Sequence, residues 1–205
     1  MKHRITIGVD EVGRGSLAGP VVVSAVVLPD VDYPWIAEIR DSKKLSAKKR
    51  EYLAKLIRDN CHFTLASAEP YQIDEMNIFQ ATLMCMREAA RRLALVLTRD
   101  DRELLVLVDG NQTIPNLDLP GVKQQAVVGG DNLHKCIAAA SIVAKVHRDE
   151  YMISLDIILP MYGFARHKGY GTEEHREAIM VYGPSDIHRK TFRGVYEYVK
   201  SESIS

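Results

Sequence analysis

The sequence predicts an α/β fold in which helices flank a mixed β-sheet, followed by a helical C-terminal region. Three observations support this prediction: β-branched runs near the N-terminus, a continuous apolar run of strand length in mid-chain, and helical patterns between and after them. With 205 residues, of which 46% are hydrophobic, the chain is long enough for one sizeable core. We therefore expect a single domain over residues 1–205, with its helical C-terminal part beginning at about residue 173.

The first third of the chain indicates two strands joined by a glycine-rich turn. Apolar side chains alternate with polar or small ones in RITIGVD, and GPVVVSAVVLP is rich in β-branched residues. Ser46 is a candidate N-cap for the helix that follows. The elements expected up to residue 97 are two strands, a helix, a strand and a second helix, over residues 4–10, 19–29, 46–60, 61–70 and 73–97.

The rest of the chain begins with the apolar run ELLVLVDG, which is typical of a strand buried on both faces. A further short strand and a long helix rich in small residues follow it, and two shorter helices complete the chain. These elements are expected over residues 103–110, 122–131, 132–159, 173–182 and 185–199.

The composition excludes several classes of protein. No apolar stretch reaches the roughly 18 to 20 residues that a membrane span requires, and the N-terminus has no signal-peptide pattern, so we expect a cytoplasmic protein with no membrane association. The three cysteines lack any C-x-x-C spacing, which argues against a disulfide framework and a cysteine zinc site.

The charge distribution does not identify a polyanion-binding protein, because 27 basic residues balance 27 acidic ones. Basic residues nevertheless cluster at three places, each of which is either a solvated surface or a contact for phosphates. The clusters comprise Lys43, Lys44, Lys48, Lys49 and Arg50; Arg166, His167 and Lys168; and His188, Arg189, Lys190 and Arg193.

The stretch GVDEVGRGSLAG places two adjacent carboxylates, Asp10 and Glu11, before three glycines. A dinucleotide-binding loop would continue into a helix, whereas here Pro20 leads into a strand. Hard oxygen ligands suit Mg²⁺ or Mn²⁺, and two such ions about 3.5 to 4 Å apart can stabilise both oxygens of a phosphodiester exchange. Because neighbours in a regular strand point to opposite faces, we expect the strand to end or bend at this pair.

Two further acidic residues are candidate ligands. Asp109 ends the most apolar strand, where sites in α/β sheets gather, but an Asp-Gly turn would explain it as well. Asp131 is equally consistent with an N-cap of the long helix that begins near Leu133. Only as a set do these residues favour a metal site.

The set of motifs resembles a known family. The motifs, in chain order, are GVDEVGRG, LAGPVVVSAVVL, DSKKLS, IDEMNI, LVDGN, AAASIVAKVHRD, YGFARHKGYGT and HRKTF. Together they span nearly the whole chain and are similar to those of bacterial ribonuclease HII. The resemblance implies a ribonuclease H-like fold and endonucleolytic cleavage of RNA in RNA–DNA hybrids and 5′ of single ribonucleotides in duplex DNA. It further implies a monomer, Mn²⁺ or Mg²⁺ in a two-ion site, and attack by water that leaves a 5′-phosphate and a 3′-hydroxyl.

The resemblance also implies roles for individual residues. The residues that match the family's metal-binding catalytic acids are Asp10, Glu11, Asp109 and Asp131. The residues that match its substrate contacts are Gly13, Arg14 and Gly15 at the ribose, Tyr170 beneath that sugar, and Lys43 near the phosphates.

Two other functions fit parts of the pattern. A different metal-dependent nuclease of related fold would not need the Gly-Arg-Gly loop and Tyr170, because it would ignore the 2′-hydroxyl. A non-catalytic protein that binds hybrids is disfavoured, since uncompensated carboxylates beside a phosphate backbone would weaken binding.

Overall fold

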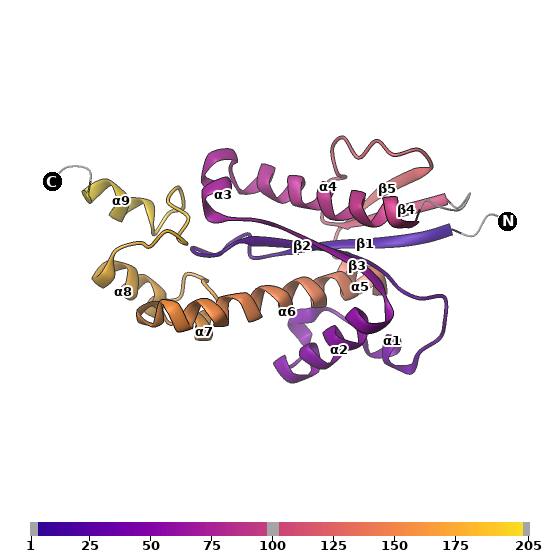
Figure 1. The fold of residues 1–205 in the computed structure, drawn as a ribbon, viewed down its shortest axis with the longest axis horizontal. Coiled ribbons are helices and arrows are strands. Elements are labelled where there is room, and N and C mark those ends of the chain that lie inside the picture. The colour runs from indigo at the N-terminus through magenta and orange to yellow at the C-terminus, as the bar shows by residue number, and fades with distance from the viewer. Residues whose placement is uncertain (1–3, 98–102, 203–205) are drawn as a thin grey trace. The chain divides into compact units, whose positions relative to one another are not determined.

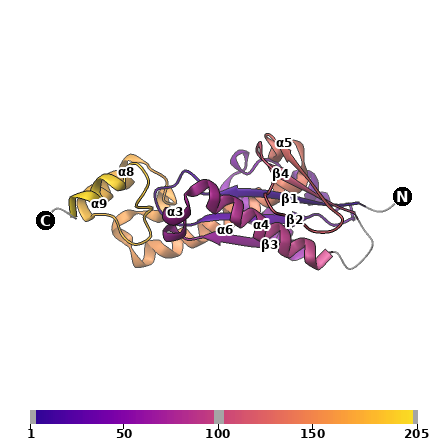
Figure 2. The ribbon, with the colours of Figure 1, turned by 90° about the horizontal axis from the view of Figure 1, so that it is seen from above.

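The computed structural model contains a five-stranded sheet in the order β3-β2-β1-β4-β5. The central strand β1 (Arg4–Val12) pairs antiparallel with β2 (Val21–Val27) and parallel with β4 (Glu103–Asp109), and β4 pairs parallel with β5 (Val122–Val127). The edge strand next to β2 is β3 (His62–Ala68). Figure 2 shows β4, β1, β2 and β3 side by side in this order. The mixed α/β sheet that the sequence predicts is thus confirmed.

The structure describes residues 4–97 and 103–202, and these divide into two compact units. Unit 1 comprises the chain up to Val12, Val22–Ala66 and Leu83–Val146. Unit 2 comprises Gly13–Val21, Ser67–Thr82 and the chain from His147 onward. The expectation of one domain stays a prediction.

Helices cover both faces of the sheet in unit 1. Figure 1 shows α4 (Ile78–Leu97) on one side and α6 (Lys135–Ile158) with α2 (Ala47–Asn60) on the other. The helix α6 approaches β1 closely, because a Cβ on Gly8 would lie 2.2 Å from the carbonyl carbon of Cys136. Burial of apolar side chains from α2 and α6 in one core cluster stabilises this arrangement.

Several helices follow the expected boundaries. The N-cap Ser46 accepts a hydrogen bond from the amide of Lys49, which confirms the start of α2. The helix α8 (Glu173–Tyr182) matches the expected range. Trp35 lies buried in the short helix α1 (Pro34–Glu38), where it packs in the core.

The expected helix over residues 73–97 is wrong at its start. The chain forms α3 (Pro70–Met76) and then α4. Asn77, with a positive φ of 68°, separates the two helices. The side chain of Asn77 accepts hydrogen bonds from the amides of Phe79 and Gln80 at 3.0 and 3.1 Å. An Asn that competes for backbone donors in this way ends one helix and caps the next.

The C-terminal helix expected over residues 185–199 is also wrong, because only α9 (Tyr196–Glu202) forms there. In unit 2 the preceding segment forms isolated turns and also bonds to the loop that follows β1. The amide of Gly19 donates to the carbonyl of Ile187 at 2.8 Å, and the amide of Arg189 donates to Leu17 at 2.8 Å. These bonds replace the ones that a helix would need.

Candidate active site

The two parallel central strands bring Asp10 and Asp109 together in unit 1. Val9 lies opposite Val108 in the β1–β4 register, so Asp10 and Asp109 form the next pair along. The Asp10 side chain is buried, with 6% of its surface exposed, and Asp109 is half-buried. Two carboxylates on neighbouring strands, Asp10 within β1 and Asp109 at the end of β4, concentrate negative charge at one point.

The surroundings of Asp10 disfavour its ionised form. Burial raises the pKa of this carboxyl well above its usual range, and the charges of Glu11 and Asp109 raise it further. A hydrogen bond from Ser141 and one from the amide of Glu11, at 2.7 Å, act in the opposite direction. A bound cation would relieve the repulsion, which is what a metal ligand of this kind requires.

Asp131 lies near Asp109 but is not the N-cap that the sequence left as an alternative. It belongs to the first turn of α5 (Gly130–Leu133), whose N-cap is Gly129. Burial raises the pKa of Asp109, the amide of Gly130 lowers it by a 2.7 Å hydrogen bond, and the Asp131 charge raises it again. Sequence reasoning missed Gly130, where a Cβ would lie 2.5 Å from Cδ1 of Ile137 and 3.2 Å from the Asp109 carboxylate, so a larger residue would crowd this acid.

Glu11 does not occupy a strand end. The expected end or bend at the Asp-Glu pair is wrong, because β1 continues to Val12 and Glu11 pairs with Val23 of β2. The antiparallel ladder with β2 includes both residues and so favours an extended chain. Glu11 therefore acts on Asp10 through its charge.

The charges of the four acids act on one another, but their side chains are not arranged around one point. Within residues 4–97 and 103–202, no three His, Cys, Asp or Glu side chains are grouped closely enough to hold a metal ion. Like charges repel at short range, so carboxylates of this kind converge fully only around a cation.

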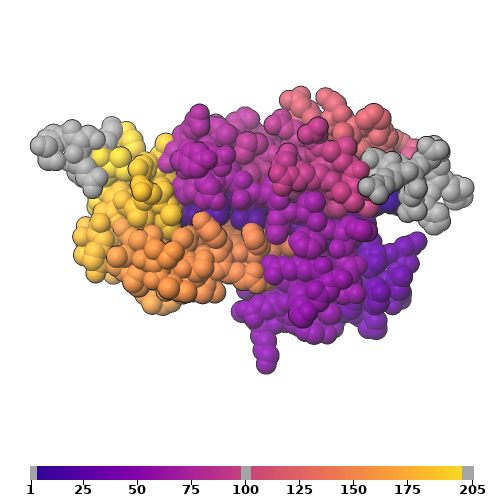
Figure 3. Space-filling view, in the orientation of Figure 1, coloured from indigo at the N-terminus to yellow at the C-terminus, as the bar shows by residue number. Residues whose placement is uncertain are grey.

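Lys43 belongs to the same region of unit 1. It lies in the short 3-10 helix η1 (Ser42–Lys44), where the Asp41 carboxylate accepts a hydrogen bond from its amide at 2.9 Å. Its charge lowers the pKa of Asp109, so the ammonium lies within electrostatic reach of that acid. Lys43 is exposed, and the helix α2 that follows it lies at the molecular surface (Figure 3).

The Gly-Arg-Gly loop lies in unit 2 and contains two different kinds of glycine. Gly13 has a φ of +89°, and a Cβ on it would lie 2.2 Å from Nε of Arg148, so the fold requires glycine here. Gly15 has nothing within 4 Å of its Cβ position. Its backbone is therefore open to the approach of a ligand, and Arg14 is exposed beside it.

Two fully buried arginines, whose burial sequence reasoning missed, donate hydrogen bonds to carbonyl groups of this loop and of the residues that follow it. Arg148 donates to Pro20, Lys168 and Ala18 at 2.8, 2.8 and 3.0 Å. Arg189 donates to Gly13, Arg14 and Gly19 at 2.7, 2.9 and 2.9 Å. Charged donors make strong hydrogen bonds, so the two guanidiniums fix the path of the loop.

The third basic cluster is consequently not a uniform phosphate-binding surface. His188 and Arg189 are buried, and so is His167 of the second cluster. Arg166, by contrast, is exposed and forms an ion pair with Glu174. For these three buried residues, both interpretations of the basic clusters, as solvated surface and as a contact for phosphates, are wrong.

Tyr170 lies beside the Gly-rich loop within unit 2. Its backbone forms a β-bridge with Ser16, and the preceding carbonyl, that of Gly169, accepts a hydrogen bond from the amide of Leu17 at 2.8 Å. The Arg148 guanidinium lies 5.5 Å from the centre of the half-buried Tyr170 ring. The structure thus brings the loop and the aromatic residue together, as the family pattern implies.

A chain of histidines supports the backbone of Tyr170 from within unit 2. The amide of Ser185 donates to Nδ1 of His188, so the hydrogen of His188 is on Nε2 and is donated to Nε2 of His175 at 3.1 Å. Nδ1 of His175 then donates to the carbonyl of Tyr170 at 3.0 Å. This chain needs both rings in the neutral form.

We expect the histidine chain to make the protein sensitive to acid. Burial lowers the pKa of His175 from 6.5 to about 4 and that of His188 from 6.5 to about 3. The unfolded chain therefore takes up protons first as the pH falls below 6.5, and stability declines from there until the folded pKa is reached. At pH 5 each histidine should cost about 2 kcal/mol of the free energy of unfolding.

Urea unfolding at pH 7, 6 and 5 measures this decline. His188→Gln should reduce the slope of stability against pH, whereas His62→Gln, at an exposed histidine of β3, should leave it unchanged. A wild-type stability that is flat between pH 7 and pH 5 would contradict the proposed neutral chain.

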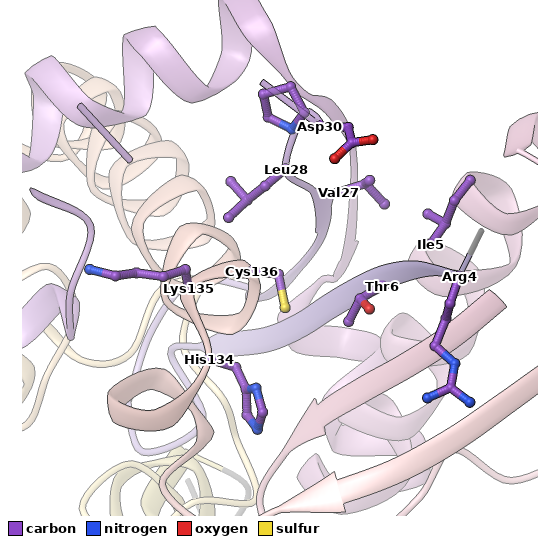
Figure 4. A pocket seen from close by; sticks show the side chains of 10 residues that line it. Arg4, Ile5, Thr6, Val27, Leu28, Asp30, His134, Lys135 and Cys136 are labelled. Carbon is purple, nitrogen blue, oxygen red and sulfur yellow. The ribbon is translucent and has the colours of Figure 1, made fainter. Parts of the chain in front are cut away.

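A cavity of about 370 Å³ in unit 1 contains none of these residues. It is lined by the start of β1, the end of β2 and the residues His134, Lys135 and Cys136 (Figure 4). The side chains of His134 and Lys135 extend in different directions in this view, and burial raises the pKa of the Cys136 thiol to about 11. A thiol with a raised pKa is less often in its reactive, ionised form.

The fold and the carboxylates at its central strands define a metal-requiring nuclease of the ribonuclease H class. Residues 7–195 match the family model described as Ribonuclease HII, and the chain belongs to that family. The Ribonuclease HII of Geotalea daltonii is 49% identical over 195 residues, which cover 95% of this chain and 85% of that protein. The protein is therefore an RNase H endonuclease, a hydrolytic enzyme that requires metal.

Two solved structures are similar to this one. An RNase HII of Archaeoglobus fulgidus, solved in a complex with PCNA, has a TM-score of 0.75 and 27% identity and covers 92% of this chain and 95% of its own. A Bst-RNase HIII in complex with Mn²⁺ has a TM-score of 0.70 and 19% identity, covering 98% of this chain and 71% of its own. The likeness to the second structure confirms the fold. Among the helices that the structure describes, none has the length and apolar character of a membrane span.

Proposed function

We propose that this ribonuclease hydrolyses the RNA strand of RNA–DNA hybrids and cuts duplex DNA 5′ of single ribonucleotides, leaving a 5′-phosphate and a 3′-hydroxyl. The family acts on RNA–DNA hybrids. The observation that carries the proposal is the proximity of Asp10 on β1 to Asp109 at the end of β4, each one residue beyond the Val9–Val108 pair and each with a raised carboxyl pKa. Perturbed acids of this kind mark functional sites more often than structural ones.

The donor set fits Mg²⁺ or Mn²⁺. Every candidate ligand supplies a carboxylate oxygen, which hard divalent cations prefer, and the Bst-RNase HIII structure contains Mn²⁺. The residues that would hold two ions are Asp10, Glu11, Asp109 and Asp131. Such ions supply activation of the attacking water and stabilisation of the charge that develops on the phosphate oxygens.

The chain's own residues bind and orient the substrate. The exposed ammonium of Lys43 contacts a phosphate, and the open backbone at Gly15 approaches the 2′-hydroxyl that distinguishes RNA from DNA. The Tyr170 ring packs beneath the same sugar. Gly13 and Arg14 contribute to ribose binding through the backbone of this loop, in which Arg189 donates hydrogen bonds to the carbonyls of both residues.

Three substrates test this function with Mg²⁺ or Mn²⁺ present. They are a duplex DNA that carries one ribonucleotide, an RNA–DNA hybrid, and an all-DNA duplex of the same sequence. We expect cuts in the first two only, with the first cut 5′ of the ribonucleotide. Cleavage of the all-DNA duplex at a comparable rate would overturn the proposed recognition of the 2′-hydroxyl.

We expect substrate binding to weaken steeply with salt, despite the zero net charge. Lysines that contact phosphates displace condensed counterions, and each contact adds about 0.9 to the slope of log affinity against log salt for duplex DNA. Lys43→Ala should remove one such contact and so reduce the magnitude of this slope by about 0.9. Lys55→Ala is the control, since that exposed lysine of α2 pairs with Asp59. An affinity that is constant from 50 to 200 mM salt would contradict the phosphate contact.

We also infer that the enzyme acts as a monomer in the cytoplasm. The three cysteines are free. A reducing compartment favours free thiols.

A further inference from the structure

Three buried polar side chains in unit 1 form a line from the strand β1 to the DSKK turn. The side chain of Ser141, on α6, lies within hydrogen-bonding reach of the Asp10 carboxyl and lowers its pKa. Oγ of Ser42, in η1, lies 3.0 Å from Oγ of Ser141. Asp10, Ser42 and Ser141 are 6%, 4% and 8% exposed, so water competes little for these bonds.

The direction of the bonds follows for the ionised form of Asp10, which is the form that would hold a cation. An ionised carboxylate can only accept, so the hydroxyl of Ser141 must donate to Asp10. The oxygen of Ser141 is then free to accept, and the hydroxyl of Ser42 donates to it. The line therefore has one arrangement, in which Ser42 donates to Ser141 and Ser141 donates to Asp10.

Both serines are held in place by their own surroundings. Ser141 lies on α6, which approaches the backbone of β1 so closely that only glycine fits at position 8. The carbonyl of Ser42 accepts a hydrogen bond from Nη1 of Arg50 at 2.5 Å, and Asp41 caps the same turn. The two hydroxyl groups therefore have fixed positions, and fixed positions are needed if they are to orient the Asp10 carboxyl.

We infer that Ser141 and Ser42 are positioning residues of the active site. Ser141 fixes the orientation in which the Asp10 carboxylate receives a cation, and Ser42 fixes the hydroxyl of Ser141. Because Ser42 precedes Lys43 in the chain, this line also ties the proposed phosphate contact to the proposed metal ligand. The inference rests on the proposed role of Asp10 and deepens it.

Loss of such a supporting hydrogen bond typically weakens metal affinity 10- to 100-fold. We expect Ser141→Ala to weaken Mn²⁺ binding by about 10-fold. Ser42→Ala should act in the same direction but less, since the Ser141 hydroxyl can still reach Asp10 by rotation. Once Ser141 is alanine, the additional Ser42→Ala change should have little further effect, because the line is already broken.

Isothermal titration of the metal-free protein with Mn²⁺ measures these affinities, and thermal melting without metal measures stability. Ser24→Ala is the matched control. Ser24 is fully buried, lies opposite Asp10 on β2, and has no hydrogen-bond partner for Oγ among the described residues. It should bind Mn²⁺ as the wild type does. If Ser141→Ala does not fold, Ser141→Cys keeps the volume and weakens the donor.

Two outcomes separate this inference from the proposed function. Wild-type Mn²⁺ affinity in Ser141→Ala, together with loss of binding in Asp10→Asn, would overturn the positioning role and leave the metal site standing. Wild-type affinity in Asp10→Asn would overturn the metal site itself. Fully additive losses in the double variant would contradict the link between the two serines.

Discussion

Replacement of Asp10 by asparagine is expected to abolish turnover and, at the same time, to raise the melting temperature of the metal-free protein. Asparagine nearly keeps the shape of the side chain but removes the charge that would hold the cation. Loss of several kcal/mol of transition-state stabilisation corresponds to a fall in rate of about a thousandfold or more.

The stability effect follows from the raised pKa of Asp10. A carboxyl whose folded pKa lies above its unfolded pKa stabilises the protein at low pH, and that contribution is lost as the pH rises through the folded pKa. At neutral pH the ionised group is therefore a net cost, chiefly because of burial. Asparagine cannot ionise, so the metal-free variant should melt at a higher temperature.

Rates at saturating Mg²⁺ and melting curves without metal test both parts. Asp109→Asn should also abolish turnover, and Asp131→Asn should be less severe. Asp59→Asn, at an exposed acid that pairs with Lys55 on α2, is the control and should remain active. Near wild-type rates in Asp10→Asn would show that the assignment of Asp10 as a metal ligand is wrong.

Tyr170→Ala is expected to lose most of the activity on a duplex that carries a single ribonucleotide, and Tyr170→Phe only part of it. One 2′-hydroxyl recognised by hydrogen bonds contributes about 1 to 3 kcal/mol, so packing of the ring against the sugar must add to the discrimination. Arg148 and the bridge to Ser16 hold the ring beside the loop. Gly15→Ala should also reduce cleavage, because a methyl group would fill the open space above that backbone.

Cleavage rates and melting temperatures of all three variants separate recognition from packing. Tyr71→Ala, at an exposed tyrosine of α3 in the same unit, controls for the loss of a ring. If Tyr170 only packs its loop, Phe should be neutral and Ala should lower stability as much as activity. A Tyr170→Ala protein that cuts at the wild-type rate would eliminate the proposed role.

The sequence by itself determined the succession of strands and major helices along the chain, the family, and the candidate acids. Each of these depends on local information: alternation in β1, the continuous apolar run of β4, the cap at Ser46, and motifs of a few residues. The position of Asp109 at the end of β4 is of this kind, because it follows from where the apolar run stops.

Only the tertiary structure decided features that depend on partners distant in sequence. The ladder with β2 extends β1 past Glu11, and Asp131 lies inside the short helix α5, which is capped by Gly129, instead of capping the long helix α6. The buried guanidiniums of Arg148 and Arg189 look like surface charge in the sequence, because their carbonyl partners lie more than a hundred residues away or in an irregular loop. The same holds for Ser42 and Ser141, which are 99 residues apart and meet only because packing of helix against sheet brings their hydroxyls together.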